Sequence, residues 1–123
     1  MKENEKKGKD FELYVGKEYE TLGYTVSYNG IGKKRKDEGI DIIAKNYQEI
    51  LLIQCKNWKS KKITHKELKE FIANCMIYKE KYLKNEKRNI KNIYITSNDI
   101  LEKSAKYFIN ENKNIIQYET IKY

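Results

Sequence analysis

The stretch that most constrains this chain is residues 37–58, DEGIDIIAKNYQEILLIQCKNW, which predicts two strands joined by a turn at residues 46–48. The second strand, residues 51–56, is apolar on both faces until it reaches Gln54 and Lys56. Side chains two residues apart on a strand share a face, so these two lie side by side. A strand that is apolar on both faces is typical of the covered centre of a sheet, where a polar pair is costly without partners. The chain therefore predicts a central strand whose polar end needs an explanation.

An amphipathic helix is predicted ahead of this hairpin, from about Gly8 to Gly23, which suits a helix end. Its apolar stripe, at spacings of three and four, consists of Phe11, Val15, Tyr19 and Leu22. Glu12 follows Phe11 by about 100° around the helix and so borders the buried stripe. We expect residues 1–7 to be frayed and residues 24–28, YTVSY, to form a strand.

Two more helices and two more strands are predicted after the hairpin. The T-x-x-E sequence at residues 64–67 is a capping box for a helix whose apolar face carries Leu68, Phe71, Ile72, Cys75, Met76, Tyr82 and Leu83. Residues 85–92 read as a polar linker and residues 93–96 as a strand. Asp99 with Glu102 can cap a third helix, which carries Ile100, Leu101, Ala105, Phe108 and Ile109, and residues 115–118 form a closing strand.

This order predicts an α/β fold with a mixed central β-sheet flanked by helices, in a single domain spanning residues 1–123. The two cysteines lie in apolar patterns without metal-ligand spacing, which indicates reduced, buried thiols. His65 is the only histidine and lies in the capping sequence, so we expect it to be structural or exposed. No apolar run approaches the roughly 20 residues that span a bilayer, and no signal peptide is visible. We therefore expect a cytoplasmic protein with no membrane contact.

The charge balance favours a polyanionic partner. Lysine and arginine number 26 against 18 acidic residues, which gives a formal net charge of +8. A lysine-rich composition unrelated to binding would give the same balance. Two basic stretches are candidates for phosphate contact, with solvated charge as the alternative. Their members are Lys33, Lys34, Arg35 and Lys36 in the loop before the hairpin, and Lys59 and Lys61 after it.

Four polar residues can converge at one edge of the predicted sheet: Glu12, Asp41, Gln54 and Lys56. Two carboxylates and an amide oxygen are hard ligands of the kind Mg²⁺ prefers, and the ion keeps several waters for a substrate phosphate. Such an ion orients a water and stabilises charge on a phosphate under attack. A neighbouring lysine can position or deprotonate that water, or balance the charge of the transition state. Each residue taken singly also has an ordinary structural explanation.

The motifs GKDFELYV at residues 8–15, GYTV at 23–26, DEGIDIIA at 37–44 and LLIQCKNW at 51–58 resemble the Mrr-like branch of the PD-(D/E)xK restriction endonuclease superfamily. The likeness extends over roughly residues 8–108 and implies a restriction-endonuclease-like core. It implies that Asp41 is the principal metal ligand, Gln54 a variant ligand, Lys56 the catalytic lysine and Glu12 a supporting ligand. The backbone carbonyl of Cys55 would also face the metal.

The resemblance implies a Mg²⁺-dependent DNA endonuclease, with Mn²⁺ as a substitute ion. Gln54 removes one negative charge from the usual acidic pair, which weakens metal affinity unless Glu12 compensates. Cleavage of both strands of a duplex takes two active sites, so we expect a homodimer. With 123 residues we expect no separate recognition domain, and specificity would come from DNA shape or from a separate specificity or helicase partner. Two alternatives remain: an enzyme selective for branched DNA, resembling Holliday junction resolvases, and a catalytically silent DNA-binding module.

Overall fold

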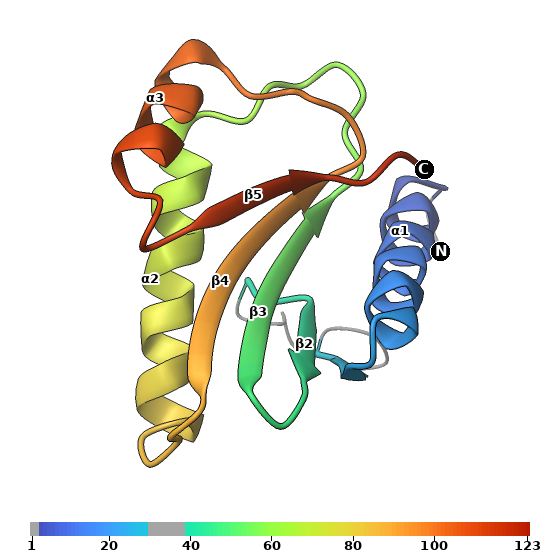
Figure 1. Cartoon of the computed structure of the whole chain (residues 1–123). Helices are drawn as coiled ribbons and strands as arrows, with labels where there is room; N and C mark the ends of the chain where they lie inside the picture. Colours follow the sequence, from blue (N-terminus) through green and yellow to red (C-terminus); the bar gives the residue numbers. More distant parts are fainter. Residues whose placement is uncertain (1–2, 30–38) are drawn as a thin grey trace.

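The computed structural model describes residues 3–29 and 39–123 and has the predicted order of elements (Figure 1). The helices and strands are α1 (Glu3–Thr21), β1 (Thr25–Tyr28), β2 (Ile42–Lys45), β3 (Glu49–Lys56), α2 (His65–Tyr82), β4 (Asn89–Thr96), α3 (Lys103–Glu111) and β5 (Gln117–Thr120). The five strands form one mixed sheet in the order β1-β2-β3-β4-β5. The first three strands are antiparallel, and β3, β4 and β5 are parallel. The predicted α/β class is confirmed.

The central strand β3 has apolar side chains on both faces, as its sequence predicts. Helix α1 covers one face of the sheet, and α2 and α3 cover the other (Figure 1). Leu51 and Ile53 pack with Phe11 and Val15 of α1, whereas Leu52 belongs to the cluster under α2 and α3. Alternation along β3 therefore divides the core into two layers, one on each face.

Local signals place most of the boundaries. Asn46 closes the turn between β2 and β3, because its side-chain oxygen accepts hydrogen bonds from the backbone N–H groups of Gln48 and Glu49 at 2.9 and 2.8 Å. The capping box of α2 is formed by Thr64 and Glu67 as predicted. His65 is exposed at the start of that helix.

The predicted start of α3 is wrong. The helix begins at Lys103, and Glu102 occupies the cap position without a side-chain cap bond. The segment before it is extended: Ile63 N–H donates to the Ile100 carbonyl at 2.7 Å, and Leu101 pairs with Ile63 in an isolated parallel bridge. This pairing draws Ile100 and Leu101 out of the helical period and buries both side chains.

Four further details differ from the expectation. Helix α1 begins at Glu3, ahead of Gly8, because an apolar period marks only the part of a helix that packs. Strand β4 begins at Asn89, so the second half of the predicted linker is strand that pairs with β3. Leu22 follows the end of α1 and is 70% exposed. On α2, Met76 and Tyr82 point away from the core and are more than half exposed.

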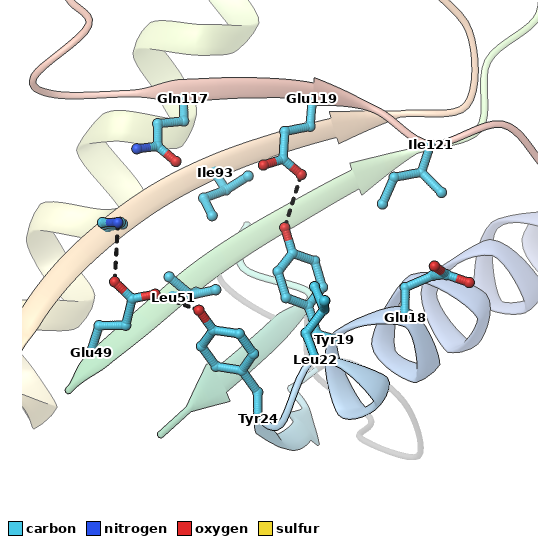
Figure 2. Close-up of a pocket in the computed structure, with 11 residues that line it drawn as sticks. Glu18, Tyr19, Leu22, Tyr24, Glu49, Leu51, Ile93, Gln117, Glu119 and Ile121 are labelled. Atoms are coloured by element: carbon cyan, nitrogen blue, oxygen red, sulfur yellow. Dashed lines mark hydrogen bonds and ion pairs between the residues drawn. The ribbon is translucent and has the colours of Figure 1, made fainter. Parts of the chain in front are cut away.

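A hollow of about 300 Å³ lies beside the C-terminal part of α1, over β3, β4 and β5 (Figure 2). Five of its polar side chains are paired with one another. Tyr19 donates a hydrogen bond to Glu119 at 3.0 Å, and Tyr24 donates one to Glu49, which also pairs with Lys91 at 3.0 Å. These contacts join the end of α1 and the segment after it to three strands.

Gly39 allows α2 to approach the segment that leads into β2. Its φ of +78° lies in the left-handed region, and a Cβ built on it would stand 2.0 Å from Nδ2 of Asn74 on α2. The glycine two positions before Asp41 thus fixes how the chain enters the sheet. Within the described residues no helix is long and apolar enough to cross a membrane.

We expect Gly39→Ala to lower the free energy of unfolding by about 1–3 kcal/mol, because alanine resists this φ and meets Asn74. Gly8→Ala is the matched control: it has no neighbour within 4 Å in a helix, so it should stabilise by roughly 0.5–1 kcal/mol. Urea denaturation measures both. The double variant Gly39→Ala/Asn74→Ala separates the destabilisation caused by the clash with Asn74 from that caused by backbone strain at residue 39. A Gly39→Ala protein as stable as wild type would contradict this account.

The Tyr24 contact should make stability depend on pH. The hydrogen bond from Tyr24, and then the one from Lys91, lower the pKa of the Glu49 carboxyl. A lowered pKa in the folded state contributes stability above the unfolded value of about 4.3, and this is lost as pH falls through the folded pKa. Tyr24→Phe should therefore cost about 1 kcal/mol at pH 7 and progressively less below about pH 4. Tyr47→Phe, at a side chain 87% exposed in the turn, is the control. A Tyr24→Phe deficit that is constant from pH 7 to pH 3 would contradict the assignment.

Candidate active site

A second hollow, of about 500 Å³, lies at the C-terminal end of β3, beside the N-terminal half of α1. The connections that follow β3 and β4 run side by side at this end of the sheet (Figure 1). The hollow is lined by Gly8, Glu12, Asp41, Cys55, Lys56, Asn57, Trp58, Lys59, Ser60 and Lys61. Six of the residues proposed from the sequence thus line one place: Glu12, Asp41, Cys55, Lys56, Lys59 and Lys61.

Asp41 is held where β2 begins. Its backbone N–H donates to the Ile53 carbonyl at 2.8 Å, although the ladder pairs Ile53 with Ile42. The hydrogen bonding shifts by one residue here, and the Asp41 carboxylate accepts the N–H of Cys55 at 2.8 Å. The side chain is only 6% exposed. A buried carboxylate is stabilised by such charge-assisted bonds, which also fix its orientation.

Glu12 enters the hollow from α1, where it is half-buried at the border of the apolar stripe. Glu12, Asp41 and Cys55 line the same hollow, so both carboxylates act on the Cys55 thiol. Burial raises the pKa of that thiol, the negative charges of Asp41 and Glu12 raise it further, and Lys56 opposes them. Two carboxylates and one ammonium group therefore surround the end of β3.

Gln54 and Lys56 are both half-buried, but only Lys56 lines the hollow among the described residues. Alternation puts Cys55 on the α1 side of β3 and Gln54 on the side of Leu52. Gln54 is the register partner of Tyr94, whose ring packs on Phe71 of α2 at 5.5 Å. Lys56 stands at the end of the strand, and its long side chain reaches the hollow.

Lys59 and Lys61 are exposed and line the hollow after the end of β3. The four basic residues of the loop before the hairpin, Lys33, Lys34, Arg35 and Lys36, lie outside the described residues.

The residues that fix the connection after β3 were not predicted from the sequence. Ser97 N–H donates to the Lys56 carbonyl at 3.2 Å, and Ser97 Oγ donates to Asn57 Oδ1 at 2.6 Å. Asn98 Nδ2 donates to the carbonyl of Trp58 at 3.1 Å. The signal that could have found them is the polar run T-S-N directly after the apolar strand at residues 93–95. Polar residues at the end of a buried strand usually serve a neighbouring segment.

The donor set of the hollow fits a magnesium ion. The described residues contain no group of three or more His, Cys, Asp and Glu side chains that could hold a metal. Mg²⁺ does not need such a cage, because it is commonly bound by one or two carboxylates together with waters and substrate phosphates. Glu12 and Asp41 supply two carboxylates, and both line this hollow.

Comparison with known proteins identifies the family. The family model described as restriction endonuclease, for the Mrr catalytic domain, matches residues 4–120. No curated protein and no solved structure matches the chain. The match covers all the elements that build the hollow, and the mixed sheet flanked by helices is consistent with a restriction-endonuclease-like fold. The chain therefore belongs to the Mrr-like restriction endonuclease family of the PD-(D/E)xK superfamily, a family of nucleases.

Proposed function

We propose that this domain is a Mg²⁺-dependent DNA endonuclease that hydrolyses phosphodiester bonds at the hollow beside β3. The observation that carries the proposal is that Glu12, Asp41 and Lys56 line one hollow in a chain of a nuclease family. The silent DNA-binding alternative leaves a buried carboxylate and a lysine at the end of the central strand without a purpose.

Asp41 and Glu12 are the side chains that would hold the ion, with the backbone carbonyl of Cys55 and the amide of Gln54 as the further ligands implied by the family resemblance. When bound, Mg²⁺ supplies an oriented water and stabilises negative charge on the phosphate, and Mn²⁺ can replace it. Asp41 suits this role because the Cys55 N–H fixes one carboxylate oxygen, Oδ2, and thereby orients the other.

Lys56 is assigned the role of the catalytic lysine. Its ammonium group can hydrogen-bond the attacking water or a non-bridging phosphate oxygen, and it balances charge that grows on the phosphate. The carbonyl of Lys56 accepts the N–H of Ser97, so the backbone that carries this side chain is tied to the end of β4.

Substrate binding is assigned to the basic side chains around the hollow. Lys59 and Lys61 suit phosphate contact, which gives affinity without sequence preference and is weakened by salt. The four basic residues at positions 33–36 are proposed for the same role. We propose a homodimer for cleavage of both strands, with sequence choice left to DNA shape or to a separate specificity or helicase partner.

The cleavage test uses supercoiled plasmid and a four-way junction, each with Mg²⁺ and with EDTA. We expect cutting only with Mg²⁺, and a loss of at least 100-fold in Lys56→Ala and in Asp41→Ala, the scale seen when a catalytic charge is removed. Lys113→Ala, on the loop before β5 and away from the hollow, removes an equal charge and should cut at the wild-type rate. Gel analysis of nicked and linear products measures all four proteins.

The preferred substrate distinguishes the two candidate nuclease activities. Cutting of plasmid supports a restriction-type endonuclease, whereas cutting confined to the junction supports a branched-DNA enzyme. DNA binding without cutting, unchanged by either substitution, would overturn the proposed function and favour the silent module.

The proposed role of Gln54 as a metal ligand is tested by replacing its neutral amide with a carboxylate. Asp41 directly precedes Ile42 and Gln54 directly follows Ile53, the register partner of Ile42, so both residues lie just past the last pair of the two strands. If the Gln54 amide reaches the ion, Gln54→Glu should lower the Mg²⁺ concentration for half-maximal cutting by about 3- to 10-fold, because a carboxylate binds this ion more strongly. Gln48→Glu, in the turn at the far end of the hairpin, is the control for added charge. An unchanged Mg²⁺ dependence would confine Gln54 to the α2 side of the sheet.

A further inference from the structure

The connection after β3 places Trp58, the only tryptophan of the chain, close to two lysines of the hollow. The Nζ atom of Lys56 lies 5.3 Å from the centroid of the Trp58 ring, and the Nζ atom of Lys61 lies 4.4 Å from it. A cation within about 6 Å of an aromatic face is attracted by the ring quadrupole, most strongly when the ring is tryptophan. One ring therefore attracts both ammonium groups.

The ring itself is held from two sides. The Trp58 side chain is half-buried and packs against the apolar cluster under α2 and α3. Its backbone carbonyl accepts the amide of Asn98, and the residue before it, Asn57, accepts the hydroxyl of the buried Ser97. The two residues directly after β4 thus fix the segment that carries the Trp58 ring, which both lysine side chains approach.

A fixed aromatic ring can hold a flexible lysine side chain in one position in this hollow. A lysine side chain loses rotamer entropy when it is fixed in one place, and a reacting group displaced by about 1 Å can lose most of its effect. Glu12 and Asp41 line the same hollow and attract the ammonium group away from an incoming phosphate. An aromatic ring attracts a cation without neutralising it, so it can restrain Lys56 and leave its charge for the substrate.

We propose that Trp58 is a positioning residue for phosphodiester cleavage: its indole ring holds the ammonium groups of Lys56 and Lys61 at the hollow before DNA binds. Lys56 is thereby set for the bond under attack and Lys61 for a neighbouring phosphate. The inference rests on the proposed function for its consequence in cleavage, but the placement of the two lysines can be measured without cleavage.

The kinetic experiment compares Trp58→Leu, Trp58→Phe and wild type on the DNA that the wild type cuts. Trp58→Leu should lower kcat at saturating DNA by about 5- to 30-fold, the range that corresponds to the loss of a partly buried cation–π contact. Trp58→Phe keeps a weaker aromatic face and should lie between the two. Release of Lys61 should add a smaller rise in KM.

Phe108→Leu is the matched control. Phe108 packs against the same apolar cluster and also lies under a lysine, with Nζ of Lys69 at 5.9 Å from its ring, but it does not line the hollow. The Phe108→Leu variant therefore measures how far the loss of a packed aromatic ring lowers the cleavage rate through stability alone. Rates are compared per folded protein at a temperature where all variants are folded. A fall in Phe108→Leu equal to that in Trp58→Leu would overturn the proposal.

The second measurement is the proton chemical shift of the lysine ε-methylene groups in ¹³C-lysine-labelled protein, assigned with Lys56→Arg and Lys61→Arg. Both groups should be shifted upfield by the indole ring in wild type, and the shift should vanish in Trp58→Leu. Shifts that are the same in wild type and Trp58→Leu would overturn the placement, and a wild-type kcat in Trp58→Leu would overturn its role. If the wild type cuts no DNA, the proposed function fails, and these shifts still decide the placement.

Discussion

The hydrogen bond from the Cys55 N–H to the Asp41 carboxylate is the contact on which the candidate site depends. It occurs where the pairing of β2 and β3 shifts by one residue, at a side chain that water scarcely reaches. A buried carboxylate is tolerated only if its charge is compensated, and here the backbone of the central strand supplies the donor. The same bond that stabilises the charge sets its position relative to Lys56, the next residue along β3. The end of the sheet and the site are therefore a single arrangement.

Periodicity predicted the fold well because each element shows its buried face in the sequence. The two-sided apolar pattern of β3 and the stripe of α1 follow directly from the layers they occupy. The errors occur where tertiary pairing overrides a local signal. Ile100 and Leu101 fit a helical period, but pairing with Ile63 makes that segment extended. Strand β4 extends back to Asn89 because it pairs with β3 along its whole length. The sequence of residues 89–92 alone does not predict a strand.

The candidate site was predictable to the extent that it lies on one hairpin. Motif spacing placed Asp41 and Lys56 at adjoining strand ends, and the helical period placed Glu12 at the border of a buried stripe. The orientation of Gln54 depends on which face of β3 the alternation assigns to α1, and that requires the whole sheet. The polar run at residues 96–98 indicates that these side chains serve a neighbouring segment, but it does not indicate which one. Ser97 and Asn98 lie in the loop after β4, about 40 residues beyond Asn57 and Trp58, and a contact of that range leaves no local sign of its partner.

The charges of the hollow explain why lysines gather around two carboxylates. Glu12 and Asp41 repel a phosphate, and the net charge of +8 acts at a distance, where salt screens it within about 10 Å. Attraction inside the hollow must therefore come from cations that are already there. Lys56, Lys59 and Lys61 meet this need because each lines the hollow itself. Two of them contact the ring of Trp58, which attracts an ammonium group without cancelling its charge. An ammonium group held at the ring therefore keeps its full charge for a phosphate at the strand end that also carries the two carboxylates.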